Sequence, residues 1–130
     1  MTTEEKNVAI AKMLSWKLYS DNKHFIIPKP LNKLCEDHFQ NLGLPEELKF
    51  HSDANWQFEA IERIKYISEN SKNFFGKYVD IQFLLDFLNG VELYIDKKRV
   101  FMQTSFGENQ LKGAIFEALY QFSQYLKQKQ

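Results

Sequence analysis

The hydrophobic pattern of this chain is clearest near its C-terminus, over residues 108–127, where apolar side chains recur at steps of three and four. Because an α-helix has about 3.6 residues per turn, these positions lie on one face of a helix. The face consists of Leu111, Ala114, Ile115, Ala118, Leu119, Phe122 and Leu126. Ser105 and Glu108 resemble a capping box at the helix start. The pattern predicts a final amphipathic helix that packs on the core.

Two further helices are predicted upstream. The first covers residues 3–14, with Thr3 as its N-cap and acidic residues in its first turn. The second follows Ser52-Asp53, a good N-cap pair, and extends to Glu69. Its apolar face consists of Trp56, Ala60, Ile64 and Ile67. Both helices are expected to depend on packing against the same core.

The segment between these two helices has no regular period. Residues 17–19 and 24–27 can each form a brief extended piece, separated by the turn-like Ser20-Asp21-Asn22. Pro28 and Pro30 then interrupt any regular element, because proline cannot donate to a ladder. Residues 31–48 are expected to form a long connection with the apolar anchors Leu34, Phe39, Leu42 and Leu44. The path of residues 17–50 stays open.

A β-hairpin is predicted around Asn89-Gly90, with strands over residues 78–87 and 91–96. Asn-Gly tolerates the positive φ that both central positions of a type I′ turn require. Pairing Leu88 with Val91 leaves apolar side chains on both faces: Leu84, Leu93 and Ile95 on one, and Ile81, Phe83, Leu85 and Tyr94 on the other. We therefore expect helices on both faces of the sheet. Residues 96–99 form the next turn, and residues 100–103 a third strand.

The element order predicts an α+β fold, a three-layer α/β/α sandwich with a small antiparallel sheet and three main helices. A chain of 130 residues fits one compact domain, residues 1–130, with a substantial core. Hydrophobic residues make up 44% of the chain, which is typical of globular proteins and excludes wholesale disorder.

Charge and cysteine content exclude several classes of protein. Lysine plus arginine and aspartate plus glutamate both number 17, so no surplus of cations favours nucleic-acid binding except through a partner. The lone Cys35 excludes an internal disulfide and a cysteine-rich zinc module. The polar start lacks the features of a signal peptide, and no apolar run approaches the roughly 20 residues of a membrane span. The sequence thus predicts a soluble cytoplasmic protein without membrane contact.

The three histidines, His24, His38 and His51, invite a metal hypothesis, with Asp37 and Asp53 nearby. Zinc sites typically use convergent imidazoles on short paired spacings. These histidines are widely spaced in segments expected to be loops, so they would bind a metal only if the fold gathered them.

Paired carboxylates could support acid–base chemistry. Asp80 and Asp86 alternate onto one face of a predicted strand, and Asp96 lies across the hairpin. Leu84 between them and the balanced charge favour solvated strand ends over a two-metal site. No Ser-His-Asp order, nucleophile elbow or phosphate-binding loop is present. We predict no catalytic residue, no metal site and no cofactor.

A small basic patch, Lys97, Lys98 and Arg99, lies close in sequence to Tyr94 and Phe101. Basic and aromatic residues together are the combination that binds single-stranded nucleic acid. Charges at a hairpin tip more often serve solubility and protect the sheet edge. The patch is small beside usual nucleic-acid footprints.

The final helix has a second apolar stripe, in addition to the face that packs on the core. Phe116 and Tyr120 lie almost opposite the main apolar face, and Gly113 beside them lacks a side chain, which suggests close packing. Two interpretations remain. Residues 31–48 could cover the stripe through Leu34, Phe39 or Leu42, or the stripe could be an open interaction surface, since aromatic residues are enriched at interfaces.

Three stretches together resemble a known family. They are residues 10–17 (IAKMLSWK), 48–56 (LKFHSDANW) and 114–122 (AIFEALYQF). In this order they resemble the phage ABA sandwich domain, a family of small phage and prophage proteins named for the same three-layer architecture. Here Ala54 stands where members often show a tryptophan, and the 31–48 connection is longer. The resemblance implies a phage or prophage accessory protein in the cytoplasm of a bacterial host cell, and no catalytic residue is carried over.

The expected function is therefore non-enzymatic protein binding, to a host or phage protein or by self-association. Inhibition of a host defence system, such as a CRISPR effector, is its most concrete form. The alternative is a small nucleotide-binding protein or an enzyme acting on a signalling nucleotide. A pocket lined by residues 17–30 together with residues 97–99 would favour that alternative.

Overall fold

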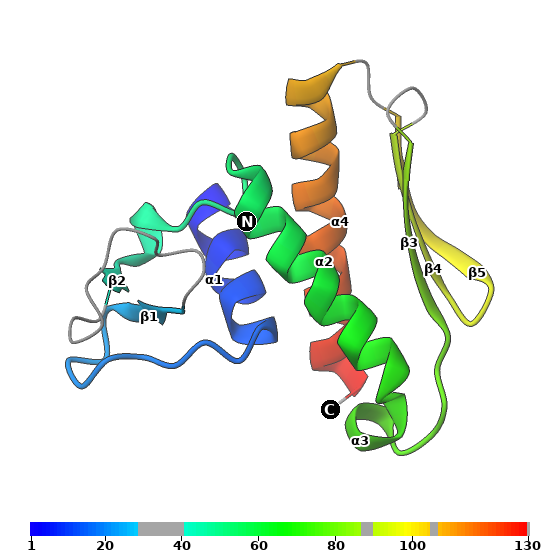
Figure 1. The fold of residues 1–130 in the computed structure, drawn as a ribbon, viewed down its shortest axis with the longest axis horizontal. Helices are drawn as coiled ribbons and strands as arrows, with labels where there is room; N and C mark the ends of the chain where they lie inside the picture. The colour runs from blue at the N-terminus through cyan, green and yellow to red at the C-terminus, as the bar shows by residue number, and fades with distance from the viewer. Residues whose placement is uncertain (29–40, 87–89, 105–106, 130) are drawn as a thin grey trace.

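The computed structural model describes residues 1–28, 41–86, 90–104 and 107–129, and it confirms the α+β class. The elements follow one another as shown in Figure 1. They are α1 (Thr3–Met13), β1 (Phe25–Ile27), β2 (Asn41–Gly43), η1 (Pro45–Glu47), α2 (Ala54–Glu69), α3 (Ser71–Phe75), β3 (Ile81–Asp86), β4 (Gly90–Ile95), β5 (Lys98–Gln103) and α4 (Glu108–Lys129).

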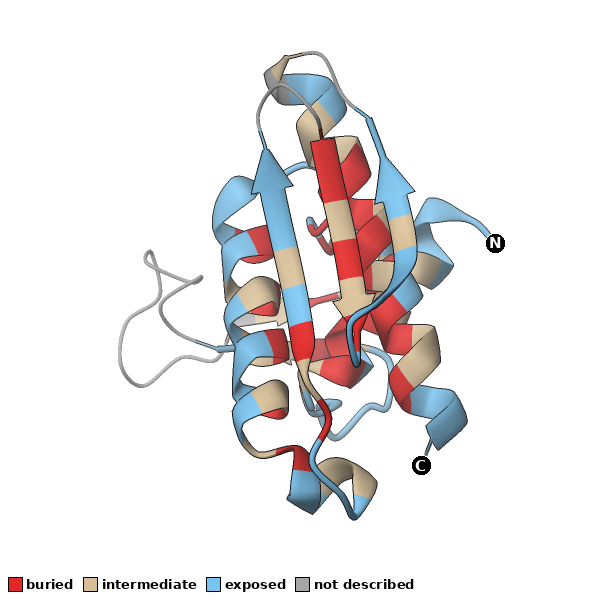
Figure 2. Cartoon of the chain, turned by 90° about the vertical axis from the view of Figure 1, so that its right-hand side faces the viewer, coloured by how far each residue is buried: buried red, intermediate tan, exposed pale blue. Residues whose placement is uncertain are grey.

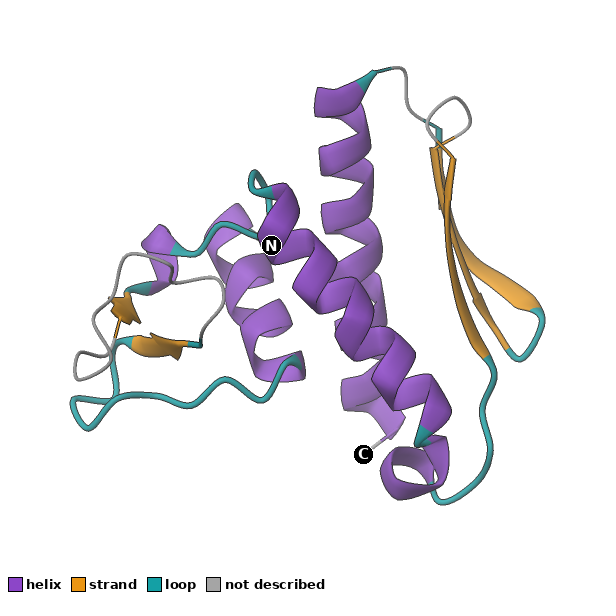
Figure 3. Cartoon of the chain, in the orientation of Figure 1, coloured by secondary structure: helices purple, strands orange, loops and turns teal. Residues whose placement is uncertain are grey.

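The three main helices lie between two antiparallel sheets, β1-β2 and β3-β4-β5 (Figures 1 and 3). Helices α2 and α4 pack on one face of the three-stranded sheet, and α1 packs on α4. No described element covers the other face of that sheet, which is turned toward the viewer in Figure 2. The layer order thus differs from the predicted α/β/α arrangement, because the helices form the middle layer.

The strand register explains this difference. Leu85 pairs with Val91 and Asp86 with Gly90, whereas the predicted register paired Leu88 with Val91. A shift by an odd number of residues moves side chains to the opposite face. The inner face therefore collects the apolar set, Ile81, Phe83, Leu85, Val91, Leu93 and Ile95, and one layer of helices is enough to cover most of it. Gly90 is the first residue of β4, whereas Asn89 lies outside the described residues.

The tight two-residue turn occurs between β4 and β5 instead. Asp96 and Lys97 both have positive φ, 51° and 67°, and Ile95 pairs with Lys98 across them. Positive φ at both central positions is the type I′ conformation, whose twist matches the paired strands. The third strand consequently begins at Lys98, two residues earlier than predicted.

The predicted helices are confirmed, with one correction at a cap. The first helix is capped by Thr2 rather than Thr3, since the Glu5 N–H donates to Thr2 Oγ1 at 3.1 Å. Asp53 caps α2 as predicted and accepts from the Asn55 N–H at 2.8 Å. Ser105 and the Glu108 side chain lie outside the described residues, so the second capping box is not described.

The extended piece predicted before Pro28 is confirmed as β1, which pairs with β2. Leu18 forms an isolated bridge with Phe25, so the chain folds back on itself across the predicted turn. Asp21 stabilises that turn, and the hydrogen bond from the Lys23 N–H is the main reason that its pKa falls to about 2. Residues 29–40, including Cys35 and His38, lie outside the described residues.

The centre of the core is an aromatic cluster of Trp16, Phe50 and Trp56, whose ring centroids lie 5.1 to 5.3 Å apart. Two buried amides tie it to the helices. The Phe50 N–H donates to Asn7 Oδ1 at 2.9 Å, and Gln57 Nε2 donates to the Phe50 and Lys112 carbonyl oxygens at 2.8 Å each. These contacts join α1, α2 and α4 around residues 48–53.

Candidate functional site

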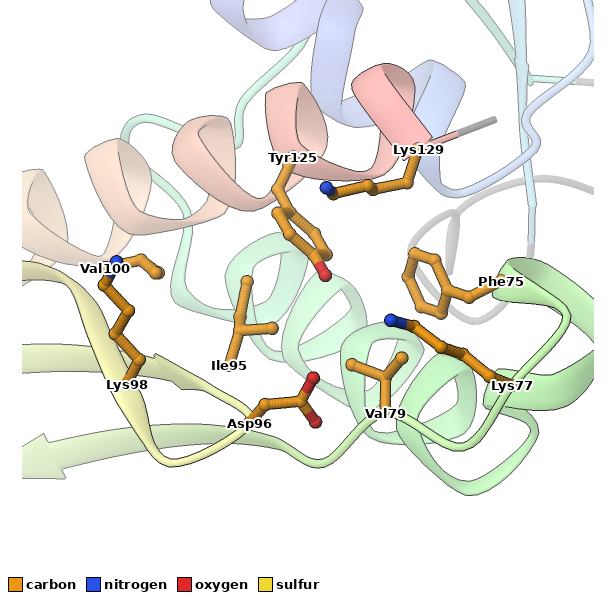
Figure 4. A pocket seen from close by; sticks show the side chains of 9 residues that line it. All are labelled: Phe75, Lys77, Val79, Ile95, Asp96, Lys98, Val100, Tyr125 and Lys129. Atoms are coloured by element: carbon orange, nitrogen blue, oxygen red, sulfur yellow. The ribbon is translucent and has the colours of Figure 1, made fainter.

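A pocket of about 470 Å³ lies where the C-terminal end of α4 faces the sheet and the segment that follows α3 (Figure 4). Three of its lining residues are lysines, and we call it the lysine pocket. Its lining residues are Phe75, Lys77, Val79, Ile95, Asp96, Lys98, Val100, Tyr125 and Lys129. The lining includes one carboxylate and three lysines, so the pocket carries a surplus of two positive charges.

Each lysine reaches the pocket from a different element. Lys77 follows Gly76, which ends α3 with a φ of 74° and redirects the chain toward the sheet. Lys98 opens β5 directly across from Ile95, and cross-strand partners share a face, so Lys98 lies on the inner face. Lys129 ends α4, where the helix dipole favours a positive charge. The fold thus brings together three cations that are far apart in the sequence.

Tyr125 extends from α4 into this pocket, with its hydroxyl directed away from the helix (Figure 4). Its ring packs against Phe75 at 5.8 Å and Phe122 at 6.2 Å between centroids, and the Lys129 ammonium lies 5.7 Å from its ring. Burial raises the pKa of Tyr125, and the negative charge of Asp96 raises it further. The hydroxyl is therefore protonated at neutral pH and is available as a hydrogen-bond donor.

Asp96 is held in place by the end of the neighbouring strand. Its carboxylate accepts from the Asp80 N–H at 3.1 Å, and its own N–H donates to the Asp80 carbonyl oxygen at 2.8 Å. Asp96 therefore lies across the hairpin beside Asp80, at one end of the hairpin. Asp86 lies at the other end, paired with Gly90, so the three carboxylates do not converge.

The predicted basic patch is divided between the two faces of the sheet. Only Lys98 lines the lysine pocket. Arg99 lies on the outer face, where its guanidinium is 3.4 Å from Glu92 and 3.3 Å from Met102 Sδ. Lys97 is an exposed residue of the turn. Sequence reasoning missed Lys77, Tyr125 and Lys129, since none belongs to a local motif.

The predicted interaction surface on α4 is largely covered within the chain. Phe116 is only 6% exposed, and the ring of His51 lies 5.9 Å from it in an edge-to-face arrangement. Tyr120 is half-buried beneath the Lys6 ammonium, which also binds Glu117 at 2.6 Å. The cover therefore comes from α1 and the segment before α2, while Leu34 and Phe39 lie outside the described residues.

Gly113 does not serve close packing, because a Cβ built on it meets nothing within 4 Å. Replacing Gly113 with Ala should therefore stabilise the protein by about 0.5–1 kcal/mol, since glycine is a poor helix former. Denaturant unfolding of the two proteins would measure the gain. A loss of stability would instead show that the protein needs a residue without a side chain at position 113, as the sequence suggested.

The histidines lie in separate surroundings. His24 Nδ1 is 2.5 Å from Asp21, and His51 Nδ1 is 2.9 Å from Asn7 Nδ2. Because Asn7 Oδ1 already accepts from the Phe50 N–H, its amide nitrogen donates to His51. Within the described ranges no three His, Cys, Asp or Glu side chains are grouped as metal ligands, and His38 lies outside those ranges.

One expectation concerned a cavity that joins the first extended segment to the basic patch. Residues 17–28 and residues 97–99 lie on opposite sides of the helical layer (Figure 1), so the pocket that would have joined them is not formed by these residues. A groove of about 680 Å³ lies between α1 and α4. Its charges are balanced, with Glu4 and Glu5 opposed by Lys12 and Lys127. The lysine pocket differs from this groove in that its side-chain charges are predominantly positive.

None of the helices in the described part of the chain is long and apolar enough to cross a membrane. Comparison of the chain with protein-family models, with curated proteins and with solved structures gave no match.

Proposed function

We propose that this protein is a non-enzymatic binding protein and that the lysine pocket takes an anionic ligand. The supporting observation is that Lys77, Lys98 and Lys129 line one pocket together with a single carboxylate. All three lysines are exposed, so their ammonium groups are accessible to a ligand. A ligand with several acceptor oxygens can accept hydrogen bonds from more than one of them.

The groups in the pocket are suited to binding rather than to catalysis. Its described lining residues include no histidine, cysteine, serine or threonine, which are common general bases and nucleophiles. Tyr125 is a neutral donor, and Asp96 is already hydrogen-bonded to Asp80. These residues are suited to holding and orienting an anion.

Replacing Lys129 with Gln should weaken binding of pyrophosphate by about tenfold, because the contribution of a charged hydrogen bond at an exposed lysine falls at the low end of the usual range, about 1.5 kcal/mol. Isothermal titration calorimetry at low ionic strength would measure this. Raising the salt concentration should also weaken binding, since added ions screen the lysines. The matched control is Lys127→Gln, which removes an exposed lysine from the same last turn of α4.

An equal loss of affinity in both variants would indicate non-specific attraction to the helix end. Failure of the unaltered protein to bind pyrophosphate at millimolar concentration would contradict the proposal directly.

A second candidate function is binding to another protein through the outer face of β3-β4-β5. Leu84 and Met102 lie on this face and are 46% and 49% exposed, and half-buried Tyr94 lies beside them. Exposed apolar patches of this kind often mark interaction surfaces. The two functions use different residues, so Leu84→Glu should impair only protein binding and Lys129→Gln only anion binding.

The biological setting that we propose is the one implied by the resemblance, a phage or prophage accessory protein in a bacterial cytoplasm. Inhibition of a defence system would follow from either function. The outer sheet face would serve contact with a protein effector, and the lysine pocket would serve capture of a charged signalling molecule.

A further inference from the structure

We infer that the ligand of the lysine pocket is a phosphate monoester attached to a planar aromatic ring, as in a mononucleotide. This inference rests on the proposed anion binding and adds the class of ligand. It follows from three properties of the pocket, namely its division into apolar and charged parts, its charge and its size.

The pocket wall has an apolar part that a bare anion would not use. Val79 and Ile95 form a buried floor, and Val100 is 45% exposed beside them. The rings of Phe75 and Tyr125 complete this wall and are themselves only half-buried. Val79 and Ile95 are already covered by the protein, so the accessible apolar surface belongs to Val100, Phe75 and Tyr125. Burying that surface favours a ligand with an apolar part of its own.

The charged part lies around this wall. In Figure 4 the ammonium group of Lys77 lies near Phe75, that of Lys129 lies near Tyr125, and Lys98 occupies the side of the pocket lined by Val100. The surplus of two positive charges matches a phosphate monoester, which carries about −1.5 to −2 charges at neutral pH. The neutral hydroxyl of Tyr125 is a further donor to phosphate oxygens.

The size of the pocket agrees with such a ligand. Its volume of about 470 Å³ lies within the range of roughly 300–1,000 Å³ that is usual for small-molecule sites. Asp96 adds a hydrogen-bond acceptor for the amino or hydroxyl groups of a nucleotide. A nucleotide has all three matching parts. Its base can pack on the apolar wall, its phosphate can bind the lysines, and its amino or hydroxyl groups can donate to Asp96.

Titration with four ligands tests this inference: adenosine monophosphate, ribose 5-phosphate, adenosine and pyrophosphate. Adenosine monophosphate should bind roughly tenfold more tightly than ribose 5-phosphate, because only the former carries a ring that can stack. Adenosine, which lacks the phosphate, should bind weakly. Tyr125→Leu should reduce the preference for adenosine monophosphate over ribose 5-phosphate to nearly one, whereas Tyr125→Phe, which keeps the ring, should retain it.

The outcomes separate the two proposals. Equal binding of adenosine monophosphate and ribose 5-phosphate, with pyrophosphate also bound, would overturn the ring inference and leave anion binding intact. A preference that survives Tyr125→Leu would overturn the assignment of the ring to this wall. Absence of pyrophosphate binding at millimolar concentration would overturn the proposed function as well. Because the comparison among ligands uses the unaltered protein, it remains decisive if a variant fails to fold.

Discussion

Replacing Gly90 with Val should lower the free energy of unfolding by about 3 kcal/mol or more. Gly90 opens β4 with a φ of 100°, a conformation that a β-branched residue strongly resists. A Cβ at this position would also collide with the Gln103 carbonyl oxygen and lie 2.8 Å from Thr104 Cα. Both obstacles are backbone atoms of the adjacent strand end, which cannot move without disrupting the sheet. Denaturant unfolding would measure the loss.

Gly76→Ala is the matched control. Gly76 also has a positive φ, 74°, but a Cβ there meets nothing within 4 Å, so only backbone strain is added. We expect a loss of about 1 kcal/mol at this position. If Gly90→Val and Gly76→Ala had similar stabilities, the inference that Gly90 lies against the end of β5 would be contradicted.

Replacing Phe50 with Ala should destabilise the protein by about 3–5 kcal/mol, the usual range for deleting a large buried aromatic side chain. Phe50 is fully buried between Trp16 and Trp56, with both ring centroids 5.1 Å away. Its removal leaves a cavity where α1, α2 and α4 meet. A thermal melt should shift downward by roughly 10 °C or more.

Phe58→Ala provides the comparison within the same chain. Phe58 lies on α2 and is 62% exposed, so its loss should change stability by no more than about 0.5 kcal/mol. If Phe50→Ala were as mild as Phe58→Ala, the aromatic cluster could not be the centre of the core.

The helices were predictable because their signals are local. The apolar period of α4 and the Asp53 cap of α2 depend only on neighbours three or four residues away. The cap of α1 was assigned to Thr3 instead of Thr2, and this error also has a local cause. Both threonines can cap a helix, but Thr2 is three residues before Glu5 and exchanges hydrogen bonds with it.

The sheet was predicted in kind but not in register. Apolar residues occupy both parities of β3, for example Phe83 and Leu84, so the pattern permits either face to be buried. The Asn89-Gly90 pair then favoured a tight turn, and the register followed from it. The packing of α2 and α4 decides which of the two alternating sets of β3 side chains is buried. This packing joins residues far apart in the sequence, so the local pattern does not reveal it.

The lysine pocket could not be predicted for the same reason. Lys77, Lys98 and Lys129 share no motif, and each resembles an ordinary surface lysine in its own segment. Only Lys98 stood in a recognised basic patch, and its neighbours Lys97 and Arg99 proved to lie elsewhere. The site arises from tertiary structure, where the ends of three elements meet.

The most direct test of the central claim is to map ligand contacts by nuclear magnetic resonance, titrating pyrophosphate into ¹⁵N-labelled protein. The account predicts that the largest amide shifts fall at Val79, Lys98 and Tyr125, which line the lysine pocket. Val8 and Met13, in the groove between α1 and α4, should remain unchanged. Shifts concentrated at Val8 and Met13, or none at millimolar ligand, would contradict the account.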